Sequence, residues 1–217
     1  MKLIEKIQQF EKKIISEKID VSDVSKLTTE FRELAPFFLY GGYIKVREDY
    51  KVYITTVEFY FHSEKKEGIH DPIVYHRNGK YLEITPFFPP LTLNAHNSGL
   101  DITFESKTGN YRASALIRAY KVMDSNGQYY LWNKEEKMFV YDKDNGKESN
   151  TQSTYLYDIL NGFSLGNNSG IEWIDSPIRF QEVDGKPRQN VYQSESECIY
   201  IPIKGKKCEW KWSFTKE

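Results

Sequence analysis

The segment from residue 50 to residue 78 constrains the fold more than any other part of the chain. It begins with YKVYITTVEFYFHS, which is rich in β-branched and aromatic residues and therefore predicts a β-strand. Because alternate side chains of a strand share a face, we expect Val52, Ile54, Glu58 and Tyr60 to point the same way. That face is mostly apolar. Burial disfavours the ionised form of a carboxyl group and tends to raise its pKa, toward the range in which the group can exchange protons near neutral pH. Glu58 is thus a candidate general base.

Hydrogen-bonding side chains follow this strand within one loop length. His70 is followed by Asp71, and then by a second group that contains His76, Arg77 and Asn78. A loop that folds back on the strand would bring an acid, an aromatic ring and these polar groups together.

Length and composition indicate one soluble domain that spans residues 1–217, with 39% hydrophobic and 28% charged residues. Thirty basic side chains against 31 acidic ones give a net charge of −1, so no overall field attracts a polyanion. Cys198 and Cys208 alone indicate a reducing compartment and cannot form a zinc site. The N-terminus has no uninterrupted apolar run, so we expect a cytoplasmic protein without membrane contact. We also expect a monomer.

Helices are expected over residues 1–35 and strands over most of the remainder. Apolar residues from Leu3 to Ile15 recur every three or four positions, which predicts an amphipathic helix that covers a sheet. Asp23 or Ser25 would cap a second helix around residues 27–34, and Pro36 would end it or start the next turn. We expect an α+β fold: a single domain with a curved, mostly antiparallel β-sheet surrounded by helices.

Two later segments have clear strand patterns. In residues 100–104, LDITF alternates apolar with polar residues. In residues 114–122, Arg118 lies among Leu116 and Tyr120 on one expected face, where an arginine requires an acid or an anionic ligand nearby. A salt bridge that only ties two strands is the alternative.

The second half of the chain contains further strand signals and one helix signal. Residues 124–153 contain two Asn-Gly turns and predict an inserted β-hairpin, and a helix is expected from Ser153 or Thr154 to Gly162. Residues 191–214 predict two closing strands.

The four histidines, His62, His70, His76 and His96, lie within 35 positions of one another. None of the usual metal-binding spacings is present, so we expect no metal and no cofactor, although a site built from these histidines stays open. His96 is retained as a candidate substrate-binding residue. Glu58 would activate a water molecule, with Arg118 or a backbone donor holding an anion nearby, and a purely structural glutamate is the alternative.

Several short motifs, in the right order, are similar to those of the methylpurine (alkyladenine) DNA glycosylases. The family's A-x-x-L-L-G resembles residues 34–41, V-E-T-E-A-Y resembles residues 56–60, P-R-N resembles Arg77-Asn78, and V-L-I-R-A resembles residues 115–119. Weaker similarity follows at residues 155–161 and 172–175. The resemblance implies excision of alkylated or deaminated purines that are flipped out of DNA. It also implies Glu58 as the catalytic residue and Tyr60, His70, Asn78 and Arg118 as substrate-binding residues.

One family motif differs in this chain. In the family, the tyrosines of the run Y-V-Y-I-I-Y-G stack on the flipped base and wedge into the gap in the duplex. This run corresponds to residues 93–99, so the wedge position falls on Ser98 and the second stacking position falls near Ala95. The asparagine that follows the run in the family is absent here. Flipping without a wedge must overcome several kcal/mol of unstacking unaided. The alternative is therefore a non-catalytic protein that binds a purine or nucleotide on the same fold.

Overall fold

The computed structural model describes residues 1–46, 49–71, 74, 86–96, 99–133, 135–136, 138–144, 149–150, 171–176, 181–188, 192–194, 197–199, 206–207 and 209–216. Two helices precede the strands: α1 (Leu3–Ile15) and α2 (Val24–Leu39). The strands are β1 (Gly42–Val46), β2 (Tyr50–Ser63), β3 (Leu93–His96), β4 (Gly99–Thr103), β5 (Tyr111–Asp124), β6 (Tyr129–Asn133), β7 (Met138–Tyr141), β8 (Ser149–Asn150), β9 (Ile171–Asp175), β10 (Gly185–Lys186), β11 (Tyr192–Ser194), β12 (Glu197–Ile199), β13 (Lys206–Lys207) and β14 (Ser213–Thr215).

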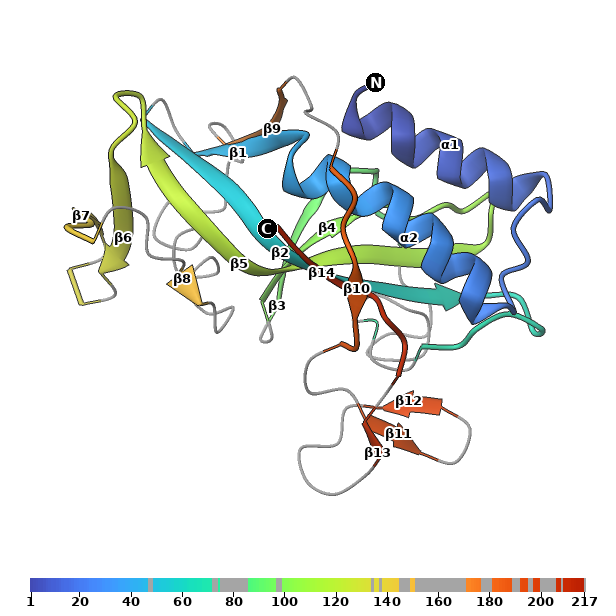
Figure 1. Ribbon diagram of the computed structural model, residues 1–217. Helices are drawn as coiled ribbons and strands as arrows, with labels where there is room; N and C mark the ends of the chain where they lie inside the picture. The colour runs from blue at the N-terminus through green and yellow to red at the C-terminus, as the bar shows by residue number, and fades with distance from the viewer. Residues whose placement is uncertain are drawn as a thin grey trace.

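The main sheet is antiparallel and is built around the two longest strands, β2 and β5. Its central order is β10-β14-β2-β5-β4-β3, and β1, β9, β6, β7 and β8 extend it at the sides. Figure 1 shows β2 and β5 as long, bent ribbons that run together across the molecule, with α1 and α2 on one side of them. The short strands β11, β12 and β13 form a separate sheet. The expected α+β fold with a curved antiparallel sheet is confirmed.

The two helices cover one face of the sheet with apolar side chains. In α1, buried Leu3, Ile7, Phe10 and Ile14 follow the three-or-four spacing of one helix face. The ring of Phe31 in α2 stacks on Phe59 of β2, with ring centroids 4.7 Å apart. Aromatic rings from the helices and the sheet therefore form the centre of the core.

The second helix begins where the sequence predicts and ends later. The Asp23 side chain caps α2 by accepting hydrogen bonds from the backbone N–H groups of Ser25 and Lys26. The expected end at Pro36 is wrong, because the helix continues to Leu39. Residues 35–39 are all buried, so their apolar packing offsets the one backbone hydrogen bond that proline cannot donate.

The alternation predicted for residues 100–104 is confirmed. Leu100, Ile102 and Phe104 belong to the main apolar core, whereas Asp101 and Thr103 point away from it. Strands β6 and β7 pair as an antiparallel hairpin next to β5, within the region where the sequence predicts one. The helix expected over residues 153–162 lies outside the described residues. Neither described helix combines the length and the apolar character that a membrane span requires.

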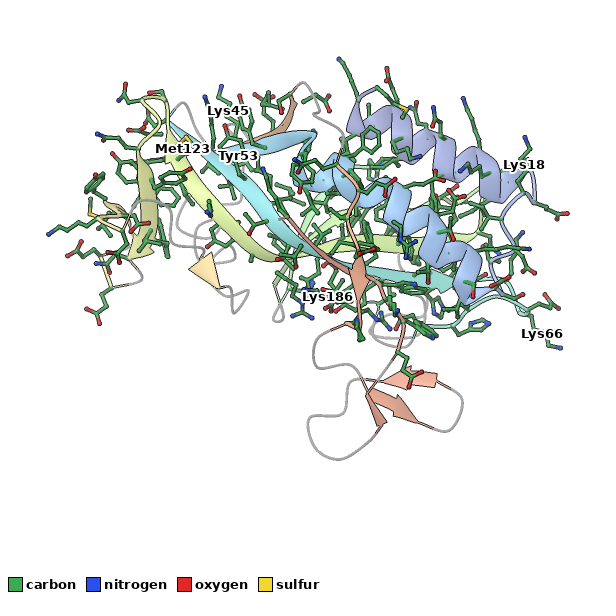
Figure 2. All side chains as sticks on the ribbon, viewed as in Figure 1. Lys18, Lys45, Tyr53, Lys66, Met123 and Lys186 are labelled. Carbon is green, nitrogen blue, oxygen red and sulfur yellow. The ribbon has the colours of Figure 1, made fainter. Side chains whose placement is uncertain are left out.

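The residues labelled in Figure 2 show how the two long strands are oriented in the molecule. Figure 2 shows Tyr53 and Met123 at one end of β2 and β5, together with Lys45, and Lys18 and Lys66 at the opposite end of the molecule. Lys186 marks β10, which pairs with β14 beside the middle of β2. The candidate site lies in this middle part of the sheet, on the face away from the helices.

Candidate functional site

Two bulges in the β2–β5 ladder decide which side chains face the site. Ile54 pairs with Tyr120, Thr56 with Ala119 and Val57 with Ile117, so Thr55 and Arg118 have no counterpart across this ladder. A bulge adds one residue to a strand and shifts the alternation of every side chain beyond it. The bulges thus bend both strands and turn Arg118 toward β2.

The bulges also correct two predictions about shared faces. Val52 and Ile54 belong to the main apolar core on the helix side, whereas Tyr60 belongs to a separate small cluster. The expected common face of Val52, Ile54, Glu58 and Tyr60 is therefore wrong. In the same way, Tyr120 joins the main core and Leu116 joins the cluster of Tyr60.

The face of the sheet away from the helices is polar and buried. Glu58 pairs across the ladder with Leu116, and Leu116 pairs with Asp101, so these three side chains form one row across β2, β5 and β4. Tyr60, Ser114 and Thr103 form the next row. All six side chains are buried. Since ionised and hydroxyl groups are costly to bury without partners, the face must be held by internal contacts.

Glu58 lies at the centre of a three-residue hydrogen-bonded group. Arg118 Nη2 donates to Glu58 Oε1 at 2.6 Å and contacts the Tyr60 hydroxyl at 2.9 Å. The Tyr60 hydroxyl in turn donates a hydrogen bond to Glu58 Oε1. The Glu58 side chain is fully buried, and the Arg118 side chain keeps 17% of its surface exposed. Arg118 is therefore the most exposed of the three side chains.

The pKa shifts in this group are consistent with a neutral phenol and a charged guanidinium. Burial and the negative charge of Glu58 raise the pKa of Tyr60 well above its usual value. Burial acts to lower the pKa of Arg118, but Tyr60 and Glu58 outweigh this effect, and the net pKa of Arg118 is raised. At neutral pH the hydroxyl therefore stays a donor and the arginine stays a cation.

A second buried ion pair adjoins Tyr60 and was not anticipated from the sequence. Arg188 Nη1 donates to Asp71 Oδ2 at 2.5 Å, and both side chains are fully buried. The Arg188 guanidinium carbon lies 4.9 Å from the centroid of the Tyr60 ring and 5.1 Å from the centroids of Trp210 and Trp212. The Tyr60 ring is thus shared between the Glu58 group and this aromatic cage.

A third group lies at the β3–β4 end of the polar face. His96 Nε2 is 3.2 Å from Asp101 Oδ2, and Ser114 Oγ donates to the same oxygen at 3.2 Å. Asp101 shares its row with Glu58 through Leu116, and neighbouring strands are about 4.8 Å apart. The structure therefore places His96, in β3, on the same buried face as Glu58, three strands from β2 in the sheet order.

The remaining predicted site residues lie elsewhere in the structure or outside the described residues. His70 is exposed; its Nε2 contacts the Lys66 carbonyl oxygen at 3.1 Å, and its ring meets His62 edge-on with centroids 5.2 Å apart. Within the described part of the chain it has no hydrogen bond to Glu58 or Tyr60. Asn78, together with His76 and Arg77, lies outside the described residues.

A metal centre finds no support in the described ranges. No group of three or more histidine, cysteine, aspartate or glutamate side chains lies there in positions that would hold a metal ion.

Comparison of the chain with models of protein families, with characterised proteins and with solved structures finds no match.

Proposed function

We propose that this protein is a DNA base-excision N-glycosylase that acts on alkylated or deaminated purines. One observation carries the proposal: a fully buried carboxylate, Glu58, is held on the polar face of the sheet by the Arg118 guanidinium and the Tyr60 hydroxyl. Hydrolysis of a glycosidic bond uses a positioned carboxylate of this kind. The resemblance of residues 56–60 and 115–119 to the methylpurine glycosylase motifs supports the same assignment.

In the proposed reaction, Glu58 accepts a proton from a water molecule as its oxygen bonds to the anomeric carbon of the sugar. The N-glycosidic bond breaks, and its electron pair leaves with the purine. Arg118 fixes the orientation of the carboxylate, because it donates directly to Oε1. Tyr60 fixes the same oxygen through its hydroxyl. His96, placed by its contact with Asp101, contributes to binding of the base.

The experiment is an excision assay with purified full-length protein. The substrates are DNA duplexes and single strands that contain hypoxanthine or 3-methyladenine, with undamaged DNA as the control. The proposal expects release of the free base and alkali-sensitive strands in at least one of the four combinations. Absence of release from all four, at protein in large excess over DNA, contradicts the proposal.

A second function has its own support, namely a protein that binds a purine or nucleotide without catalysis. Two buried acids in this region are each paired with an arginine, Glu58 with Arg118 and Asp71 with Arg188, as in a site that binds a neutral ligand. This function predicts that free purines raise the melting temperature while duplex DNA has no measurable affinity. Thermal-shift and DNA-binding measurements on the same protein separate the two functions.

A further inference from the structure

Arg188 has an unusual environment for a buried arginine. Its guanidinium lies among Tyr60, Trp210 and Trp212, and its Nη1 donates to Asp71. Such contacts fix the plane of the guanidinium, because the rings restrict its tilt and the carboxylate restricts its rotation. The remaining donors of this side chain therefore point in defined directions.

Two of those donors have no acceptor. Arg188 Nε and Nη2 are buried and lack a hydrogen-bond partner in the described part of the chain. These two nitrogens form one edge of the guanidinium, the two-donor fork that matches a pair of neighbouring acceptors. An unpaired buried donor costs about 1–3 kcal/mol, so two of them on one edge require an explanation. A ligand that fills the fork provides one.

The charge around the fork narrows the class of ligand. Asp71 already neutralises Arg188, so a second anion would bring an excess negative charge into a buried position. A neutral ring with two adjacent acceptors fits better, since three aromatic side chains surround the guanidinium. A 6-oxopurine carries such a pair, O6 and N7, whereas a 6-aminopurine carries a donor at N6 beside the N7 acceptor.

We propose that Arg188 is a specificity-determining residue whose Nε/Nη2 fork reads O6 and N7 of a 6-oxopurine. The proposal rests on the proposed function, because Tyr60 links the Arg188 cage to Glu58. An aminopurine would place its N6 hydrogens against the fork, so one hydrogen bond is lost and two donors face each other. Both fork atoms are buried, so binding requires the surrounding side chains to move apart.

The test measures binding of free bases to the full-length protein by titration calorimetry and thermal shift. The probes are hypoxanthine and guanine as oxopurines, adenine as the aminopurine, and formate and inorganic phosphate as small anions that can present two oxygens to the fork. We expect both oxopurines to bind about tenfold to a hundredfold more tightly than adenine. This preference needs no variant, so it tests the proposal even if substitutions at position 188 impair folding.

Two variants then assign the preference to the fork. Arg188→Lys keeps the positive charge beside Asp71 and removes the two-donor edge, so the preference for oxopurines should disappear. Arg112→Lys changes another fully buried arginine, whose Nε and Nη1 already donate to Glu64 and Glu105, and it should keep the preference. Loss of the preference in both variants, or in neither, overturns the proposal.

Three other results of the binding measurements would also overturn the proposal. Equal affinity for adenine and the oxopurines, binding of formate or phosphate alone, or no binding of any probe each overturns the proposal. Free-base binding and DNA cleavage are separate measurements. Excision without base preference would refute the role of Arg188 alone, and base preference without excision would refute the glycosylase function alone.

Discussion

Two fully buried arginines of this protein differ in how completely their donors are used. Arg112 donates from Nε to Glu64 at 3.0 Å and from Nη1 to Glu105 at 3.1 Å and to the Pro86 carbonyl at 2.8 Å. Arg188 donates to Asp71 alone among the described residues, and its Nε/Nη2 edge is unpaired. Both guanidiniums lie against an aromatic ring, Phe87 for Arg112 and Tyr60 for Arg188.

The difference separates a structural ion pair from a candidate binding group. Arg112 ties β5 to the segments that carry its two carboxylates, so its donors serve the fold. Arg188 keeps a costly unpaired edge beside the residues that surround Glu58. A site that leaves buried donors unused gives up stability that a ligand can restore.

The largest effect is expected when each arginine is replaced by methionine. Arg112→Met leaves Glu64 and Glu105 without their shared cation and should lower the free energy of unfolding by about 3–5 kcal/mol. Arg188→Met also removes two unpaired donors, so its cost should be at least about 1 kcal/mol smaller. Urea denaturation monitored by circular dichroism measures both values, and equal losses would remove the distinction between the two sites.

Replacement of each arginine by lysine should separate the two sites in the same way, with a smaller loss of stability. Arg112→Lys keeps a cation but loses the separate Nε bond to Glu64, at a cost of about 1.5–3 kcal/mol for a charged hydrogen bond. Arg188→Lys loses no hydrogen bond from Nε and should cost less. Melting curves of the two variants at one protein concentration check the order. A larger loss for Arg188→Lys would show that its fork is satisfied in the folded protein.

The smallest effect is expected in the alkaline pH dependence of stability, to which Tyr60 contributes. The pKa of Tyr60 is raised well above its usual value in the folded protein, by burial and then by the charge of Glu58, and is near 10 when unfolded. The folded state therefore holds a proton that the unfolded state releases, so this stability is complete below about pH 10 and is lost as the pH rises toward the folded pKa. Tyr60→Phe should weaken the decline. Tyr111, whose pKa burial also raises, leaves a residual slope. Identical alkaline curves for the wild type and the variant would contradict this.

Sequence periodicity predicts the regular helices and strands, in which the apolar side chains recur at the constant spacing of the element. The first helix and the alternation of residues 100–104 follow this rule. The rule fails at Thr55 and Arg118, because a bulge is decided by the partner strand and leaves no mark in a single strand's pattern. It also fails at Pro36, where tertiary packing of the helix outweighs a local breaker.

The sequence predicts only those members of the candidate site that lie in recognisable short motifs. Two short segments predict Glu58, Tyr60 and Arg118 as site residues, and the structure brings these three together. Arg188 lies 117 residues from its partner Asp71, and no local pattern links them. The pair Trp210 and Trp212, alternating in the closing strand region, was the one available sign of an aromatic surface there.

The most direct test of the central claim is single-turnover excision by the wild type, Glu58→Gln and Glu105→Gln on the best substrate from the assay above. Glu105 is an equally buried carboxylate paired with an arginine, so its variant controls for the loss of one buried charge. If Glu58 accepts the proton from water, Glu58→Gln should slow release of the base by about 10²–10⁴-fold, whereas folded Glu105→Gln should stay near the wild-type rate. Wild-type activity in Glu58→Gln, or equal losses in the two variants, would contradict the account.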